Sequence, residues 1–134
     1  MLSDAYPPEH IPAPQKRHIL LVDDSEDYRD ATARKLEQLG YSVRTANDYH
    51  SALPLAEGGD PLDLLITDIV MPGRIHGLSL VNRVRMRRRR LKVIYITSYD
   101  LLALTLPDGL VVRKGDGVER LIEAVQEIFS PDGE

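Results

Sequence analysis

The sequence contains no cysteine, so disulfide bonds and thiolate metal sites are excluded. This absence fits a reducing compartment, and we expect a cytoplasmic protein. No apolar stretch approaches the roughly 18 residues that a membrane-spanning helix needs. The amino terminus also lacks the basic and then apolar pattern of a signal peptide. The sequence therefore predicts a protein without membrane contact, and its formal charge of −4 argues against a general nucleic-acid binder.

The chain has 134 residues, a length typical of one domain that buries its own core. We expect residues 1–16 to form a disordered tail, because four prolines interrupt them and no apolar periodicity is present. We expect the domain to span residues 17–129 and residues 130–134 to fray. The initial methionine and the tail favour a stand-alone protein over a piece cut from a larger one.

Short apolar runs alternate with amphipathic segments along the middle of the chain. The predicted strands are residues 19–22, 42–46, 63–67, 92–97 and 110–112, and the predicted helices lie between 25 and 39 and at 48–57, 77–89 and 118–129. Strands that alternate with helices indicate an α/β fold with a parallel sheet covered on both faces. The second strand alternates in polarity, which places it at an edge. The sequence thus predicts a doubly wound, flavodoxin-like sheet of five strands in the order 2-1-3-4-5.

Several details of the helices follow from spacing alone. In the first helix, apolar residues at helical spacing extend to Leu39, Gly40 ends the helix, and Asp24 or Ser25 caps its start. In the second, Pro54 should kink or shorten the helix. In the third, the inward residues are predicted to be Leu78, Val81 and Val84.

Polar residues follow four of the predicted strands. Asp23 and Asp24 follow the first, Asp68 the third, Thr97 ends the fourth, and Lys114 comes just after the fifth. Parallel strands end at one edge of the sheet, so these side chains should meet there. Clustered carboxylates repel one another, and a hard cation such as Mg²⁺ relieves the repulsion. The set suits metal-assisted phosphoryl transfer to a carboxylate, in which positioning and charge neutralisation matter most.

These residues resemble the receiver domain of two-component response regulators over residues 17–129. The matching motifs are Leu21-Val22-Asp23-Asp24, Asp68 with Met71-Pro72, Gly77-Leu78, Ile96-Thr97-Ser98 and Val112-Arg113-Lys114. Each motif alone is weak, but together and in this order they are highly specific.

The resemblance implies a role for each matching residue. Asp68 would be the phospho-acceptor, with Asp24 bound directly to Mg²⁺, Asp23 mostly through water, and the Val70 carbonyl as another ligand. Thr97 and Lys114 would bind the phosphoryl oxygens. A histidine kinase or a histidine phosphotransfer protein would be the donor, and an unknown downstream protein would receive the signal. The chain would be no enzyme in the ordinary sense, since it would catalyse only its own phosphorylation and dephosphorylation.

The sequence departs from the family around its fifth strand. Gly115 stands where proline usually follows the lysine, and Val111 stands at the switch position that usually carries an aromatic residue. Only 17 positions separate Thr97 from Lys114, fewer than usual, so we expect a shortened or missing fourth helix.

Thr97 and Val111 are the expected switch residues. Residues 98–109 should change most on activation, with Tyr99 or Leu101 as the side chains that move. The loop at 72–77 is longer than usual, as in many receivers of hybrid kinases.

Four other interpretations of the acidic residues remain open. Asp23 and Asp24 could simply cap a helix, and Asp68 could start an Asx-turn. The domain could be a receiver-fold interaction module that no longer cycles phosphate, although the complete residue set argues against it. A phosphatase of the haloacid dehalogenase type would require an aspartate at position 70, where this chain has valine.

A run of basic residues crowds the end of the third predicted helix. It comprises Arg83, Arg85, four arginines at 87–90, and Lys92. Cations at this end complement the helix dipole, which favours a solvated helix end. A surface that docks a partner or nucleic acid is the alternative, but no aromatic residues interleave the run.

Overall fold

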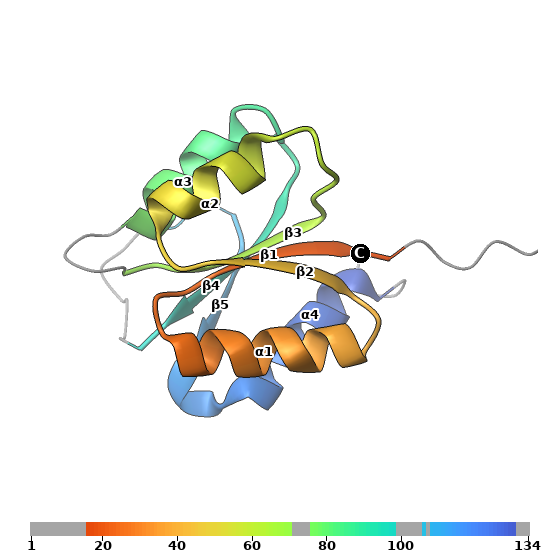
Figure 1. The fold of residues 1–134 in the computed structure, drawn as a ribbon. Helices are drawn as coiled ribbons and strands as arrows, with labels where there is room; N and C mark the ends of the chain where they lie inside the picture. The colour runs from red at the N-terminus through yellow and green to blue at the C-terminus, as the bar shows by residue number, and fades with distance from the viewer. Residues whose placement is uncertain (1–15, 71–75, 99–105, 107, 131–134) are drawn as a thin grey trace, which may run out of the picture.

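The protein is described by a computed structural model over residues 16–70, 76–98, 106 and 108–130. One parallel sheet runs through the molecule in the order β2-β1-β3-β4-β5 (Figure 1). Its strands are β1 (His18–Val22), β2 (Ser42–Ala46), β3 (Leu64–Asp68), β4 (Lys92–Thr97) and β5 (Leu110–Arg113). The predicted α/β fold, the parallel pairing and the strand order are confirmed, with β2 at an edge.

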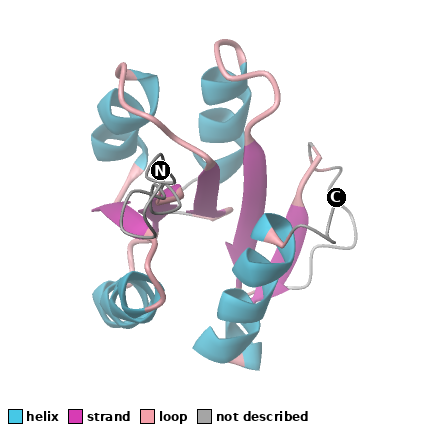
Figure 2. Ribbon diagram, turned by 90° about the vertical axis from the view of Figure 1, so that its right-hand side faces the viewer, coloured by secondary structure: helices cyan, strands magenta, loops and turns pink. Residues whose placement is uncertain are grey.

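Four α-helices in the described residues cover the two faces of the sheet. They are α1 (Glu26–Gln38), α2 (Tyr49–Glu57), α3 (His76–Arg85) and α4 (Val118–Phe129), and a 3-10 turn, η2 (Lys114–Asp116), joins β5 to α4. Helices α2 and α3 pack on one face and α1 and α4 on the other (Figures 1 and 2). The result is the three-layer arrangement expected of a doubly wound sheet.

Alternation of side chains along the strands builds two separate cores. In β1, Leu20 and Val22 join the core under α2 and α3, whereas Ile19 and Leu21 join the core under α1 and α4. All four side chains are at most 1% exposed. A strand buried on both faces is apolar at nearly every position, which explains the continuous apolar runs in the sequence.

The first two helices agree with their predictions in part. Helix α1 ends at Gln38, and Gly40 stops it with a positive φ of 100°, as predicted, although Leu39 at the C-cap is 51% exposed. Helix α2 runs through Pro54 to Glu57, so the proline does not shorten it. In such a short helix, Pro54 deletes one backbone hydrogen bond, and packing of Ala52 and Ala56 against the sheet holds the remainder.

Helix α3 also departs from its prediction, because it ends at Arg85 rather than near Arg89. Its inward residues include the fully buried Leu80, while Leu78 is only partly buried. After Arg85 the chain turns, and the Arg88 guanidinium donates to the carbonyls of Ala56, Gly58 and Asp60 at 2.8–3.0 Å. Tertiary bonds to the end of α2 therefore compete with continuation of the helix.

The connection from β4 to β5 lies mostly outside the described residues. Positions 98, 106, 108 and 109, which are described, are not helical, and the next described α-helix after β4 is α4. This agrees with a shortened or missing fourth helix. The expectations for Tyr99 and Leu101, for most of the loop at 72–77, and for residues 1–15 and 131–134 fall outside the described ranges.

Candidate functional site

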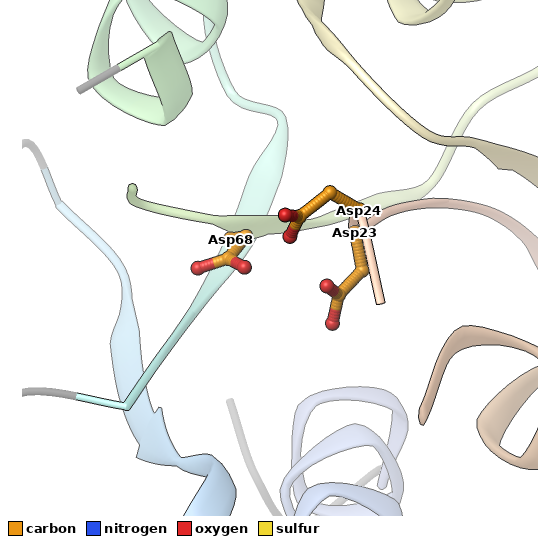
Figure 3. Close-up of side chains that lie close together, drawn as sticks. All are labelled: Asp23, Asp24 and Asp68. Carbon is orange, nitrogen blue, oxygen red and sulfur yellow. The ribbon is translucent and has the colours of Figure 1, made fainter. Parts of the chain in front are cut away.

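The carboxyl ends of the parallel strands bring the predicted polar residues together at one edge of the sheet. Asp23 directly follows β1, Asp68 ends β3, Thr97 ends β4, and Lys114 follows β5. Because β1 and β3 are neighbours, Asp23 and Asp68 lie beside each other, and Asp24 joins them (Figure 3). One carboxylate oxygen from each of the three lies within 4.8 Å of the others.

Lys114 bridges the two buried carboxylates. Its Nζ donates to Asp23 Oδ1 at 2.8 Å and to Asp68 Oδ2 at 3.0 Å. The Asp23 side chain is fully buried and that of Asp68 is 7% exposed, whereas Asp24 is exposed. The ammonium therefore offsets part of the negative charge that the fold has buried.

Burial and charge shift the pKa values of Asp68 and Lys114. Burial raises the pKa of Asp68 to about 7; Lys114 lowers this pKa, and Asp23 and Asp24 raise it further. Burial alone would lower the pKa of Lys114, but its bonds to the two carboxylates leave that pKa above its ordinary value. Charge at Asp68 is thus disfavoured by its surroundings, and a further cation would stabilise it.

One buried oxygen supports a fit to a divalent cation. Asp23 Oδ2 is buried and has no hydrogen-bond partner in the described structure, while Oδ1 accepts from Lys114 and from the Ser25 backbone N–H at 2.9 Å. A buried carboxylate oxygen without a partner is costly, and coordination would satisfy it. Three carboxylates that offer oxygen ligands within 4.8 Å of one another match the preference of Mg²⁺.

The capping interpretation of Asp23 and Asp24 is only partly met. Ser25 occupies the N-cap of α1, but its side chain makes no capping bond. The Asp23 carboxylate instead accepts the Ser25 N–H, while its buried position and its bond to Lys114 go beyond a cap. Asp24 remains exposed at the rim of the cluster.

The remaining predicted residues are at different depths. Thr97 is 1% exposed at the end of β4, and its register partner Arg113 directly precedes Lys114. Val70 is partly buried two residues beyond Asp68. Val111 is 45% exposed on β5 and pairs with the buried Tyr95 of β4. The structure thus places Thr97 at the same edge as the acids, and the predicted roles of all three residues stay predictions.

Gly77 brings the start of α3 against the backbone of the site. A Cβ added there would lie 2.1 Å from the Asp68 carbonyl oxygen and 2.8 Å from the Ile69 Cα. The Gly77 N–H also donates to the Ile69 carbonyl at 3.1 Å. Only glycine allows this close approach, so the residue fixes where α3 begins relative to Asp68.

We expect Gly77→Ala to lower the free energy of unfolding by about 3 kcal/mol, the cost of forcing a methyl group into backbone. Chemical denaturation would measure the loss. Gly59→Ala is the matched control, because a Cβ at that position meets nothing within 4 Å, so its stability should be unchanged or slightly raised. Equal stability of the two variants would contradict the close packing at Gly77.

Tyr28 is a site residue that the sequence analysis missed. Lys114 Nζ lies 5.1 Å from the centre of its ring, and its buried hydroxyl has no hydrogen-bond partner. Burial raises the pKa of Tyr28 to about 12, with further contributions from the charges of Asp23 and Asp68. The available signal was its position in the first turn of α1, four residues after Asp24, but helical spacing suggested only a core residue.

We expect Tyr28→Phe to be neutral or slightly stabilising, because it removes an unpartnered buried hydroxyl and keeps the ring under Lys114. Tyr28→Leu should instead cost about 2 kcal/mol, through lost burial and a lost cation–π contact. Thermal unfolding of both variants would check the order. A Phe variant less stable than the Leu variant would show that the hydroxyl, rather than the ring, matters.

Comparisons with known proteins agree with this geometry. The response regulator receiver domain family matches residues 19–106. The chain is 36% identical over 93 residues to the response regulator receiver protein CpdR of Brucella abortus, covering 69% of this chain and 75% of CpdR. It is 39% identical over 118 residues to the autoinducer sensor kinase/phosphatase CqsS of Vibrio cholerae, covering 79% of this chain but only 17% of CqsS.

Solved structures show the same fold. The response regulator TrrA of Thermotoga maritima, determined in complex with Mg²⁺ and BeF, has a TM-score of 0.70 and 30% sequence identity, with 84% of this chain and 99% of TrrA covered. TrrA in complex with the histidine kinase ThkA matches with a TM-score of 0.71, also at 30% identity, over 85% of this chain and 99% of the matched one.

Proposed function

Because the chain belongs to the response regulator receiver domain family, we propose that Asp68 accepts a phosphoryl group from a phosphohistidine donor in a two-component phosphorelay. Members of this family are signalling proteins rather than classical enzymes. The observation that carries the proposal is the Asp68 carboxylate, which lies 3.0 Å from Lys114 Nζ and beside two further acids at the end of the central strand.

In the proposed step, an Asp68 carboxylate oxygen forms a bond to phosphorus while the bond from phosphorus to the donor's imidazole nitrogen breaks. The imidazole leaves as a neutral base once it takes up a proton. Lys114 stays beside Asp68 and offsets charge on the transferred oxygens, and the Thr97 hydroxyl donates to one of them. In hydrolysis, water would attack the same phosphorus, the bond from phosphorus to the Asp68 oxygen would break, and inorganic phosphate would leave the free carboxylate behind.

The three acids would hold Mg²⁺, which neutralises charge on the phosphoryl oxygens when it is bound. Asp24 is the proposed direct ligand, Asp23 acts mostly through water, and the Val70 carbonyl completes the protein ligands. The partnerless Asp23 Oδ2 supports this assignment, as does the Mg²⁺ in the TrrA structure. The bond from Lys114 to Asp23 leaves that second oxygen available for the metal shell.

The proposed donor is a histidine kinase or a histidine phosphotransfer protein, supported by the structure of TrrA with its kinase. The output would be an altered protein contact, with Thr97 and Val111 at the proposed switch positions. Val111 is short and β-branched, so it cannot swing between buried and exposed positions as an aromatic side chain does.

Residues 17–129 are the proposed receiver. No helix among the described residues is long and apolar enough to cross a membrane.

A small phosphodonor separates this proposal from a receiver-fold module that no longer cycles phosphate. Phosphoimidazole carries the same phosphorus–nitrogen bond as phosphohistidine and needs no partner protein. With Mg²⁺ present, intact-mass measurement should show one added phosphoryl group, and chelation with EDTA should abolish it. An unmodified mass under both conditions would favour the interaction module.

Asp24→Asn should weaken Mg²⁺ binding by roughly tenfold or more, because the site loses one of its three charged oxygen ligands. The metal-free variant should be slightly more stable than the wild type, since like charges repel at this edge. Calorimetric titration would measure the affinity, with Asp27→Asn as the control, because Asp27 is an exposed acid of α1 outside the cluster. An unchanged affinity in Asp24→Asn would place the metal elsewhere.

A further inference from the structure

The basic run, which begins in the last turn of α3 and continues beyond it, divides into two kinds of residue. Arg83 pairs with Glu57 at 2.9 Å, and Arg85 donates to the carbonyls of Leu91 and Asp108. Arg88 donates to three carbonyls in the last turn of α2 and just beyond it. These three arginines therefore have a structural role, because their bonds connect the end of α3 and the turn after it to neighbouring segments. The helix-dipole interpretation covers only Arg83 and Arg85, because α3 ends before the other four arginines begin.

The side chains of the other cations of the run have no such partners. Among the described residues, no hydrogen bond or ion pair is made by the side chains of Arg87, Arg89, Arg90 and Lys92, and all four residues are exposed. Arg89, Arg90 and Lys92 line a hollow of about 660 Å³, together with Arg17, whose guanidinium lies 5.3 Å from the centre of the Phe129 ring. Like charges gathered without partners are unfavourable, so a ligand of opposite charge would be stabilised there.

This hollow adjoins a second one of about 440 Å³, and the two share Arg89, Arg90, Leu91, Lys92 and Ile128. We call the pair the basic trough. Apolar residues also line it, among them Leu62, Leu91, Ile128 and Phe129. Its two acids are Asp63 and Asp108, and the Asp63 carboxylate accepts the His18 backbone N–H at 2.7 Å. Cations on the rim and apolar side chains between them favour a ligand that is acidic and partly apolar.

The basic trough lies at the edge of the sheet opposite the acidic site. It includes Lys92, where β4 begins, whereas Thr97 ends β4 beside the acids, about 17 Å further along the strand. In Figure 1 this edge is the right-hand side, where β1 begins and α4 ends, and it faces the viewer in Figure 2. A ligand here would not compete with Asp68 for space.

The shape of the trough and the net charge of the protein favour one of three acidic ligands: a membrane, a nucleic acid or a protein segment. A bilayer is flat and cannot enter a concave trough. Nucleic acid is a long polyanion, and the net charge of −4 would repel it beyond the trough. A short protein segment avoids both difficulties, because its carboxylates can reach the rim while its apolar side chains contact the floor.

We propose that the basic trough docks an acidic segment of a partner protein, with apolar side chains between its carboxylates. The segment would lie along both hollows, its acids on Arg17, Arg89, Arg90 and Lys92. This inference does not rest on phosphoryl acceptance by Asp68.

A fluorescently labelled synthetic peptide of alternating glutamate and leucine would test the docking by fluorescence anisotropy. We expect Arg89→Gln combined with Arg90→Gln to weaken its binding about tenfold, through two lost charge contacts. Arg34→Gln combined with Arg87→Gln is the matched control, because both residues are exposed and neither lines the trough. The control should bind as the wild type does. Labelling of both double variants by acetyl phosphate should be unchanged.

Three comparisons sharpen the test. A peptide of alternating glutamate and serine should bind about tenfold more weakly, because it offers nothing to the apolar floor. A single-stranded oligonucleotide and phosphatidylserine vesicles should bind more weakly than the glutamate–leucine peptide. No peptide binding, equal loss in the two double variants, equal binding of the two peptides, or tighter binding of oligonucleotide or vesicles would each overturn the proposal.

Discussion

Asp68→Asn should abolish labelling by acetyl phosphate while the protein remains folded. Among the three clustered acids, only Asp68 ends the central strand and also contacts Lys114 from a slightly open position. The amide of asparagine is no nucleophile toward phosphorus, so the loss should be complete rather than partial. Intact-mass measurement after incubation with acetyl phosphate and Mg²⁺ would quantify the labelled fraction.

Measuring the stability of this variant distinguishes loss of the phospho-acceptor from unfolding of the protein. Burial raises the pKa of Asp68 to about 7, so the charged form is disfavoured in the folded protein. A neutral side chain of the same shape should therefore leave the metal-free protein as stable as the wild type, or more so. Asp60→Asn serves as the control, because its carboxylate makes only an exposed ion pair with Arg44. Persistent labelling of Asp68→Asn would show that another residue is the phospho-acceptor.

The second large effect concerns Lys114, whose loss should destabilise the metal-free protein by about 3 kcal/mol. The ammonium bridges two carboxylates whose side chains are 0% and 7% exposed, and removing one partner of a buried pair leaves charge without compensation. Lys114→Met keeps the apolar part of the side chain and removes only the charge. Urea denaturation in EDTA would measure the loss, and Mg²⁺ should recover part of it by neutralising the same carboxylates.

A second lysine of the same protein provides the comparison. Lys35 pairs with Glu119 across α1 and α4, but both side chains are largely exposed. Lys35→Met should change the free energy of unfolding by at most about 1 kcal/mol. Lys114→Met should also slow labelling by acetyl phosphate, whereas Lys35→Met should not. Similar losses for the two variants would mean that the bridge of Lys114 contributes no more than a surface pair.

The strands and the sheet order could be predicted because strands buried on both faces appear in the sequence as continuous apolar runs. Ile19, Leu20, Leu21 and Val22 are all apolar since every position faces a core. The end of α3 could not be predicted, because it depends on the bonds of Arg88 to carbonyls about 30 residues earlier in the chain. Periodicity reports which face of a helix is buried, but it does not report such tertiary bonds.

The acidic cluster could be predicted for a related reason. Parallel strands end at one edge, so residues that follow different strands meet regardless of their separation along the chain. The place of Tyr28 at the site could not be predicted, because its contact with Lys114 joins a helix to a distant turn and no local sequence pattern indicates that pair. The partnerless oxygen of Asp23 likewise follows from the three-dimensional arrangement alone.

Chemical trapping of the phosphorylated side chain tests the central claim most directly. Borohydride reduces an aspartyl phosphate to homoserine, which marks the acceptor permanently for peptide mass mapping. After treatment with phosphoimidazole and Mg²⁺, the mark is expected at Asp68, and it should be absent when EDTA replaces the metal. A mark at Asp23, Asp24 or another residue, or no mark although Mg²⁺ and donor are present, would contradict the account.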